Sequence, residues 1–268
     1  KDGSLDKITF CNLIDWHIKN KTNGLVVVGT TGESPTVDFK EHVSLIELAM
    51  SHSSGRIPII AGTGANSTTE SILLTKEAEK IGVDASLQVV PYYNKPSQLG
   101  LITHFKAIAD SVDLPIILYN VPGRTIADLS NKSVIELSKV HNIVGIKDAT
   151  ADLSRGQWLI RELPKEFLIY SGDDATAVAL ILCGADGNIS VTANVLPNVM
   201  SKLCNLALNE DYKQAVNINK ELLPIHEALF LEANPIPVKW LMSKMDLITE
   251  SIRLPLTSPN ESNKKKLL

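Results

Sequence analysis

Short apolar runs alternate with amphipathic stretches along most of the chain. The runs are rich in valine and isoleucine and begin near Leu25, Ile57, Ala85, Pro115, Ile143, Phe167 and Gly187. The stretches between them carry apolar residues at helical spacing, as in 39–50, 69–81, 99–112 and 130–140. Buried parallel strands read as nearly continuous apolar runs, and each parallel pair needs a crossover, usually a helix. The pattern therefore predicts an α/β fold in which helices cover a parallel sheet.

The spacing of the runs predicts a barrel. Their starting positions lie 32, 28, 30, 28, 24 and 20 residues apart, which is the size of a strand–helix unit. A closed barrel of this type needs eight units, and a predicted helix over 6–19 has no strand before it. We therefore expect a (β/α)8 TIM barrel whose opening strand is absent from this sequence. An open doubly wound sheet is the alternative, but neither GTTGES at 29–34 nor GTGANS at 62–67 matches its G-x-G-x-x-G turn.

The alternating pattern stops after Leu208. Helical spacing continues over 212–230 and 235–245, and a polar tail follows that contains three consecutive lysines. We expect residues 1–210 to form the barrel, lacking its first strand, and residues 211–268 to form a C-terminal helical extension.

Composition narrows the class of function. The chain has 26 basic and 30 acidic residues without a basic stripe, so neither nucleic acid nor a membrane surface is an expected partner. It has no run of about 18 apolar residues and no amino-terminal targeting segment. Cys11, Cys183 and Cys204 are widely spaced and fit neither a disulfide framework nor a metal site. We expect them to be small core residues in a cytoplasmic protein.

Lys147 is the most informative residue. It ends the apolar run at 143–146 and precedes Asp148-Ala149-Thr150, and barrel enzymes place their chemistry at such strand exits. An amine among apolar neighbours loses its proton more readily, and the free amine can attack a carbonyl to form a Schiff base. On the local pattern alone, a lysine that simply reaches water from the rim of the sheet is the alternative.

The other strand exits carry mostly hydroxyl-bearing and small residues, among them Thr30-Thr31, Tyr92-Tyr93 and Tyr119. Arg124 follows the Tyr119 run and has the guanidinium needed for a bidentate pair with a substrate carboxylate. Asp173-Asp174 lack the histidine or third ligand expected of a metal site, so we expect them to cap the next helix. We predict neither a metal nor a cofactor.

Several segments together resemble the dihydrodipicolinate synthases, a family of pyruvate-dependent (β/α)8 enzymes with a helical carboxy-terminal extension. They are GTTGES at 29–34, AGTGAN at 61–66, PYYNKPSQ at 91–98, LYNVPGRT at 118–125, GIKDAT at 145–150, SGDDA at 171–175, ISVTAN at 189–194, NPIPVKW at 234–240 and RLPLT at 253–257. The resemblance implies a lyase that joins pyruvate to L-aspartate 4-semialdehyde and forms 4-hydroxy-tetrahydrodipicolinate. This reaction is the first committed step towards diaminopimelate and lysine.

The resemblance implies four catalytic residues. Lys147 corresponds to the Schiff-base lysine, and Tyr119 to the tyrosine that transfers protons. A phenol alone is a weak base, and the family couples it to a threonine and a second tyrosine, which correspond to Thr30 and Tyr93. In the family a neighbouring subunit supplies that second tyrosine, which would make a dimer the minimal complete enzyme. The resemblance further implies a homotetramer built as a dimer of dimers.

The resemblance also implies the substrate-binding residues. Thr31 and the backbone near Ile189 would hold the carboxylate of pyruvate, and Arg124 would hold that of the semialdehyde. N-acetylneuraminate lyases share the lysine, the tyrosine and the GxTGE pattern but usually lack this arginine. They and the sugar-acid aldolases of the same superfamily are the alternative enzymes, since fold alone does not fix the substrate.

Some synthases of this family are inhibited by lysine, which binds in a cleft between paired subunits. The residues that match this cleft are Ser34, His42, Asn66, Glu70 and Tyr92. Pro35 and Phe39 depart from residues that are frequent there, and ordinary surface polarity is the alternative explanation.

A hypothesis from another class is an inactive barrel fragment that serves as an interaction partner. The missing opening strand motivates this hypothesis. Against this hypothesis, every position that the mechanism needs carries a residue of the right type.

Overall fold

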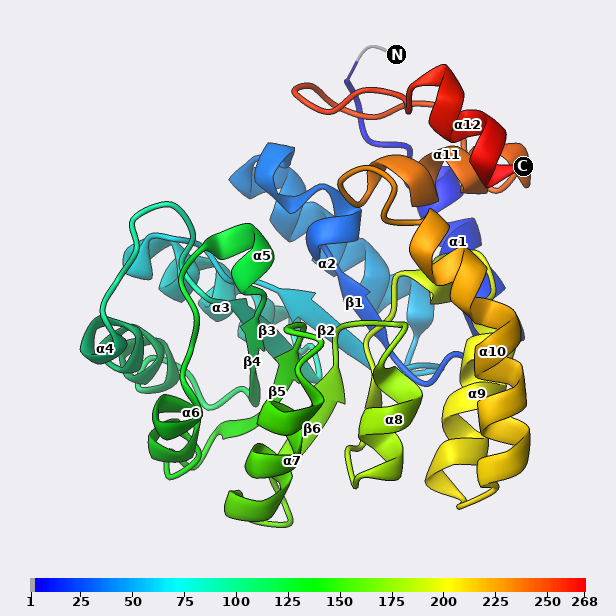
Figure 1. The fold of residues 1–268 in the computed structure, drawn as a ribbon. Helices are drawn as coiled ribbons and strands as arrows, with labels where there is room; N and C mark the ends of the chain where they lie inside the picture. The colour runs from blue at the N-terminus through cyan, green and yellow to red at the C-terminus, as the bar shows by residue number, and fades with distance from the viewer. Residues whose placement is uncertain (1–2) are drawn as a thin grey trace.

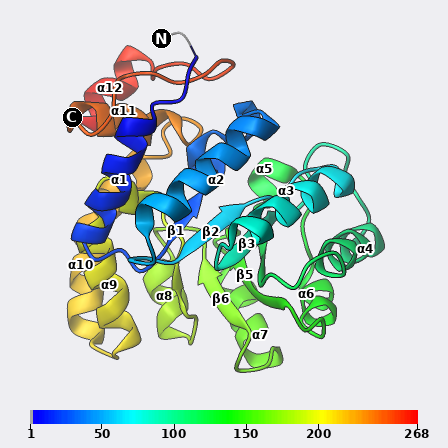
Figure 2. The ribbon, with the colours of Figure 1, turned by 180° about the vertical axis from the view of Figure 1, so that it is seen from behind.

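The computed structural model describes residues 3–268 and has a parallel sheet at its centre with helices around it (Figures 1 and 2). Among these residues the sheet has seven strands, which lie side by side in the order of the sequence from β1 to β7. A doubly wound sheet reverses its strand order at a switch point. The sequential order therefore excludes that alternative and confirms a parallel α/β fold of the TIM-barrel kind.

The strands follow the predicted runs closely, although β2, β4 and β6 begin one or two residues later. Of the run that begins at Gly187, only two residues form a strand. The strands are β1 (Leu25–Val27), β2 (Ile59–Gly62), β3 (Ala85–Val89), β4 (Ile116–Asn120), β5 (Ile143–Asp148), β6 (Leu168–Ser171) and β7 (Gly187–Asn188).

Helices follow every strand, and short 3-10 turns precede the helix in two of the connections, after β1 and after β7. The α-helices are α1 (Lys7–Lys19), α2 (Phe39–Ser53), α3 (Thr68–Ile81), α4 (Gln98–Ala109), α5 (Pro122–Thr125), α6 (Asn131–Leu137), α7 (Leu153–Glu162), α8 (Ala177–Leu182), α9 (Pro197–Leu208), α10 (Tyr212–Ala228), α11 (Ile236–Lys244) and α12 (Glu261–Leu267). The 3-10 turns are η1 (Thr30–Gly32), η2 (Ser34–Thr36) and η3 (Thr192–Asn194).

Capping residues explain where several helices begin. Asp38 accepts a hydrogen bond from the backbone of Glu41 at 2.9 Å, and the Glu41 side chain bonds back to Asp38, which starts α2. The carboxy-terminal segment, predicted as a polar tail, contains α12. The sequence signal was Asn260, whose side chain accepts from the backbone of Asn263 at 2.9 Å.

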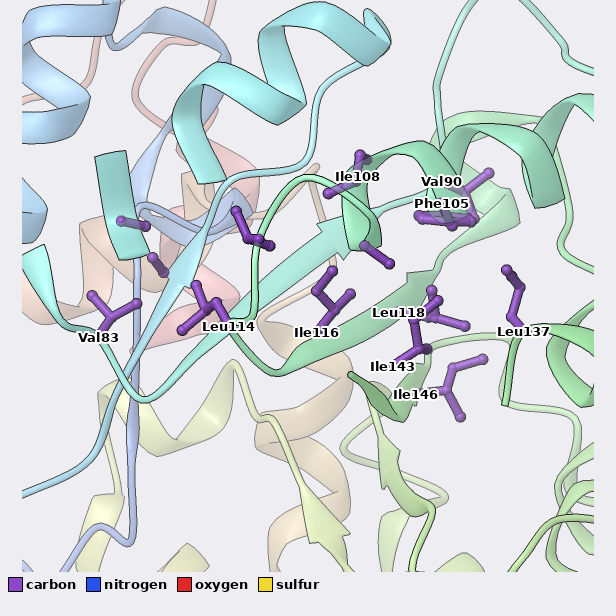
Figure 3. Close-up of a cluster of buried hydrophobic side chains, with 14 of the residues drawn as sticks. Val83, Val90, Phe105, Ile108, Leu114, Ile116, Leu118, Leu137, Ile143 and Ile146 are labelled. Atoms are coloured by element: carbon purple, nitrogen blue, oxygen red, sulfur yellow. The ribbon is translucent and has the colours of Figure 1, made fainter. Parts of the chain in front are cut away.

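Alternation along β4 separates two apolar layers. Ile116 and Leu118 point outward and pack with Phe105 and Ile108 of α4 in the cluster drawn in Figure 3. Ile117 and Tyr119 point to the other face and belong to a separate apolar cluster inside the curled sheet. Successive side chains of a strand point to opposite faces, so the outer face holds the helices and the inner face is left for the site.

The sheet is curled but not closed. Within residues 3–268, β1 pairs with β2 alone and β7 with β6 alone, so these two strands are its edges. The eighth strand and the boundary at residue 210 stay predictions. None of the helices in this part of the chain is long and apolar enough to cross a bilayer.

The three cysteines are all free, and the expectation that they are core residues is wrong for Cys183, which is exposed. Cys11 and Cys204 are partly buried. Cys183 follows the last turn of α8, where its side chain reaches the surface.

We predict that Gly145→Ala destabilises the protein. A methyl group at Gly145 would lie 2.7 Å from the carbonyl oxygen of Leu168 in the neighbouring strand, so backbone would have to move. Urea unfolding should show a loss of about 1–3 kcal/mol in the free energy of unfolding. Gly24→Ala is the matched control, because its nearest neighbour is 3.7 Å away. Equal unfolding curves for the two variants would contradict the prediction.

Candidate active site

The sheet places Lys147 beside Tyr119. The two residues are direct partners in the register of β4 and β5, and Lys147 Nζ lies 4.3 Å from the centre of the Tyr119 ring. Tyr119 is buried, at 7% exposed, and Lys147 is half-buried. An amine and a phenol are thus adjacent on the inner face of the sheet, near the carboxyl ends of its strands.

A register shift in β5 produces this pairing. Ile116 pairs with Ile143, but Ile117 pairs with Gly145, so Val144 is an extra residue in β5. Such a bulge changes which face the following side chains take. Without it Lys147 would pair with Asn120, and its side chain would point to the outer face.

Gly172, just after β6, leaves room for the lysine. A methyl group at this glycine would lie 2.8 Å from Lys147 Cε and 2.7 Å from Ala149 Cβ. Real Cβ atoms do not approach other atoms so closely. Any residue other than glycine at position 172 would therefore displace the side chain of Lys147.

The turn after β1 carries Thr30 and Thr31, and Glu33 ties it to the carboxy-terminal segment. Glu33 has a left-handed backbone conformation, with φ 59°, and is 7% exposed. Its carboxylate forms an ion pair with Lys239 of α11 and accepts a hydrogen bond from the backbone of Arg253 at 2.8 Å. A buried carboxylate needs such partners, so the turn has one defined position.

Arg253 extends this connection to α2. Its guanidinium donates to both carboxylate oxygens of Glu41, at 2.6 and 2.7 Å. The bonds from Arg253 are the main cause that lowers the pKa of Glu41. Charge-assisted pairs with two parallel bonds are geometrically specific, so the segment that contains Arg253 is fixed against the first helix after the turn.

Asn234 connects Thr31 with Arg124 of α5. Asn234 Nδ2 donates to Thr31 Oγ1 at 3.0 Å, and Arg124 Nη2 donates to the backbone oxygen of Asn234 at 2.9 Å. Asn234 is 5% exposed. Two of the predicted substrate-binding residues are therefore held by one residue of the segment between α10 and α11.

Ile189 directly follows β7, and its backbone N–H donates to Ser171 at 2.9 Å. The next residues are anchored by Asp174, whose carboxylate accepts from the backbone of Val191 at 3.0 Å and of Thr192 at 2.9 Å. The prediction that Asp173 and Asp174 cap the next helix is wrong for Asp174, which instead holds the turn after β7. The carboxylate of Asp173 accepts from the backbone N–H of Thr176, the residue before α8, at 3.0 Å.

Comparison with known proteins extends these observations. The family model of the dihydrodipicolinate synthetases matches residues 1–268. The chain belongs to the dihydrodipicolinate synthetase family. The 4-hydroxy-tetrahydrodipicolinate synthase of Nitrosomonas eutropha is 60% identical over 258 residues, which cover 96% of this chain and 88% of that protein. The corresponding protein of Herminiimonas arsenicoxydans is 56% identical over 255 residues, which cover 95% of this chain and 87% of that protein.

Solved structures of the family have the same fold. The chloride-inhibited dihydrodipicolinate synthase from Acinetobacter baumannii, complexed with pyruvate, has a TM-score of 0.98 and 53% identity, and the match covers 100% of this chain and 92% of that chain. The enzyme from Cyanidioschyzon merolae with lysine bound has a TM-score of 0.96 and 35% identity, and the match covers 99% of this chain and 90% of that chain.

Thr30 and Tyr93, the two residues expected to form a proton relay with Tyr119, make no hydrogen bond to it within the described part of the chain. Tyr93 is 90% exposed and has a left-handed backbone conformation, with φ 74°. Such a conformation is uncommon for residues other than glycine, and here it presents an aromatic ring to the surroundings of the chain.

Three of the five residues matched to the inhibitor cleft lie together. Asn66 Nδ2 donates to the backbone oxygen of Tyr92 at 3.3 Å, and burial followed by the charge of Glu70 raises the pKa of Tyr92. His42 is 5% exposed, and its Nε2 lies 2.8 Å from the oxygen of Gly62. Burial lowers the pKa of His42. Ser34, the fifth of these residues, is the first residue of the turn η2.

Sequence reasoning missed Asn234 and Asp174 as residues that hold the site. Asn234 is the first residue of the family segment NPIPVKW, but its partner Thr31 lies 203 positions away in the sequence. No local pattern could have indicated that contact.

We predict that Gly172→Ala impairs the site more than the fold. The added methyl group displaces Lys147 Cε, and a misplacement of about 1 Å can cost about 10²-fold in rate. The rate of condensation should fall by about this factor, and the melting temperature should fall by only a few degrees, since Ala149 Cβ, 2.7 Å from the new methyl group, must also shift. Gly123→Ala is the control, because a methyl group there meets no atom within 4 Å. Full activity of Gly172→Ala would show that the lysine does not need this space.

Proposed function

We propose that this chain condenses pyruvate with L-aspartate 4-semialdehyde through a Schiff base on Lys147. The observation that carries the proposal is the position of Lys147 Nζ, 4.3 Å from the Tyr119 ring centre. The chain is a lyase, and its reaction is that of its family, which yields 4-hydroxy-tetrahydrodipicolinate on the route to diaminopimelate and lysine. The relative from A. baumannii that is complexed with pyruvate supports the first substrate.

Lys147 supplies the nucleophile. Its free amine attacks the keto carbon of pyruvate, and loss of water leaves the protonated imine. The imine withdraws electrons, so a proton leaves the methyl group and an enamine forms. The enamine carbon then attacks the aldehyde carbon of the semialdehyde. The amino group of the semialdehyde finally attacks the imine carbon, which closes the ring and releases the amine of Lys147.

Tyr119 transfers the protons that these steps require. A proton must reach the hydroxyl that leaves as water, and another must leave the methyl group. The phenol of Tyr119 is buried next to the amine, which supports this role. Thr30 lies in the turn η1 and Tyr93 on the exposed loop after β3, and both are proposed partners of Tyr119.

A second copy of the chain supplies Tyr93 in this proposal. The exposure of Tyr93, at 90%, and its left-handed backbone support a ring that inserts into a neighbouring subunit. A dimer is then the smallest complete enzyme, and the proposed assembly is a homotetramer made of two such dimers.

Two groups bind the carboxylates of the substrates. Thr31 and the backbone near Ile189 hold pyruvate, and Arg124 holds the semialdehyde. A guanidinium offers a fixed fork of donors for a carboxylate, and its presence favours the synthase over an N-acetylneuraminate lyase. Every position that the mechanism needs carries a residue of the required type. This favours an enzyme over an inactive barrel fragment that only binds a partner.

We further propose a cytoplasmic location, a closed eight-stranded barrel, and lysine as an inhibitor. The three free cysteines suit a reducing compartment. An eighth strand between β1 and β7 would pair both edges of the sheet. The relative from C. merolae has lysine bound, which supports lysine as a ligand of this chain. The residues proposed to bind it are Ser34, His42, Asn66, Glu70 and Tyr92.

Pyruvate and borohydride should label Lys147. Reduction of the imine should add one three-carbon group, and peptide mapping by mass spectrometry should place it on this residue. Lys147→Arg should abolish the adduct, since a guanidinium stays protonated. Lys80→Arg is the control, because Lys80 is an exposed lysine of α3. An adduct on another lysine of the folded protein would disprove the assignment.

Tyr119→Phe should slow condensation while leaving the fold intact. One positioned acid–base group is typically worth about 10²–10⁴-fold in rate. Thr30→Val and Tyr93→Phe should also reduce the rate, and the double variant should lose less than the product of the two factors, because residues that act as a unit are not additive. Steady-state kinetics measure these losses. Independent, multiplicative losses would argue against a relay.

A further inference from the structure

Asn234 lies where the carboxy-terminal extension meets the site. The segment between α10 and α11, orange in Figure 1, runs beside the turns that follow β1, and Figure 2 shows the same neighbours from behind. Thr31 follows β1 and Arg124 follows β4, and these strands are not neighbours in the sheet. Asn234 is the residue that contacts both, with its amide on Thr31 and its backbone oxygen on Arg124.

The hydrogen bond of the amide gives the Thr31 hydroxyl a direction. A hydroxyl has one proton to donate and two lone pairs that accept. Asn234 Nδ2 donates to Thr31 Oγ1 at 3.0 Å, whereas the reverse bond, from Thr31 to Asn234 Oδ1, would span 3.4 Å. The shorter contact lies within the usual range for hydrogen bonds and the longer one lies outside it. Thr31 therefore accepts from Asn234 and keeps its own proton for another acceptor.

The backbone oxygen of Asn234 restrains Arg124 at the same time. It accepts from Arg124 Nη2 at 2.9 Å. A guanidinium has five N–H groups in a rigid fork, so one bond fixes its orientation and leaves four donors. These are enough for a bidentate pair with a carboxylate.

We propose that Asn234 is a positioning residue that prepares both carboxylate-binding groups. Its amide turns the proton of Thr31 towards the carboxylate of pyruvate, and its backbone oxygen orients Arg124 for the second substrate. The inference rests on the proposed function, because it takes the roles of Thr31 and Arg124 from there. Asn234 itself touches neither substrate.

Two substitutions separate a donor role from a shape role. Asn234→Asp keeps the shape of the side chain but replaces the donor by an acceptor, so Thr31 would give its proton to the new carboxylate. Asn234→Ala removes the bond. A hydrogen bond to a charged group contributes enough for a roughly 10-fold effect, so both variants should need roughly 10-fold more pyruvate. The readouts are the KM for pyruvate and the concentration that half-saturates the borohydride-trapped adduct, and kcat should change little.

Asn142 offers a matched control. It is also a buried asparagine, at 4% exposed, and its amide donates to the backbone of Ala109 at 3.0 Å and of Val112 at 2.9 Å. It precedes β5, at the opposite end of the strand from Lys147. Asn142→Asp should lower the melting temperature and leave the KM for pyruvate unchanged.

The outcomes distinguish the inference from the proposed function. Wild-type KM in Asn234→Asp would show that only shape matters and would overturn the inference. A double variant of Thr31→Val with Asn234→Ala should match Thr31→Val alone, and additive effects would also overturn it. If both Asn234 variants unfold while Asn142→Asp folds, Asn234 holds the fold and the positioning role is wrong. A wild-type protein that forms no pyruvate adduct contradicts the proposed function instead.

Discussion

Strand β5 has one residue more than its partner β4, and the inner face of the sheet depends on that difference. Side chains alternate along a strand, so a slip by one position sends each of them to the opposite face. The extra residue, Val144, sets Lys147 opposite Tyr119 instead of Asn120. The amine, the phenol and the space that Gly172 leaves then share one side of the sheet. Helix packing on the outer face is satisfied by Ile143 and Ile146 on either side of the shift.

The segment after residue 211 holds the loops from which the site is built. It contacts the turn after β1 through Lys239 and Asn234, and the α5 segment after β4 through the backbone of Asn234. It also reaches the turn after β7, because His226 Nδ1 lies 2.7 Å from Thr192 Oγ1. Burial lowers the pKa of His226, so the imidazole stays neutral in the folded protein near neutral pH. Loops are otherwise the most mobile part of a fold, and these contacts give three of them fixed positions.

Local patterns predicted most of the elements and singled out Lys147 at a strand exit, whereas the role expected of Tyr119 came from the resemblance to the family. Apolar runs and strand ends depend on residues that are neighbours in the sequence, so the sequence alone could indicate them. The register shift at Val144 was not, since it depends on how β5 pairs with β4. The role of Asp174 was mistaken for a cap because its partners, Val191 and Thr192, lie in the turn after a different strand. Contacts between distant segments depend on the tertiary fold, and a single sequence shows only their endpoints.

The ion pair of Glu33 also has a consequence for the order in which the protein is made. Glu33 is synthesised early. Its carboxylate accepts a hydrogen bond from the backbone N–H of Arg253, which is synthesised 220 residues later. Domains fold as the chain emerges from its amino terminus, so most of the sheet can form before these partners exist. Until then the carboxylate must stay hydrated, because burial without a cation is costly. A chain that ends prematurely would therefore contain Lys147, but its turn after β1 would lack the partners that bury Glu33. Completion of the last segment is the step at which the emerging polypeptide first fixes that turn in place.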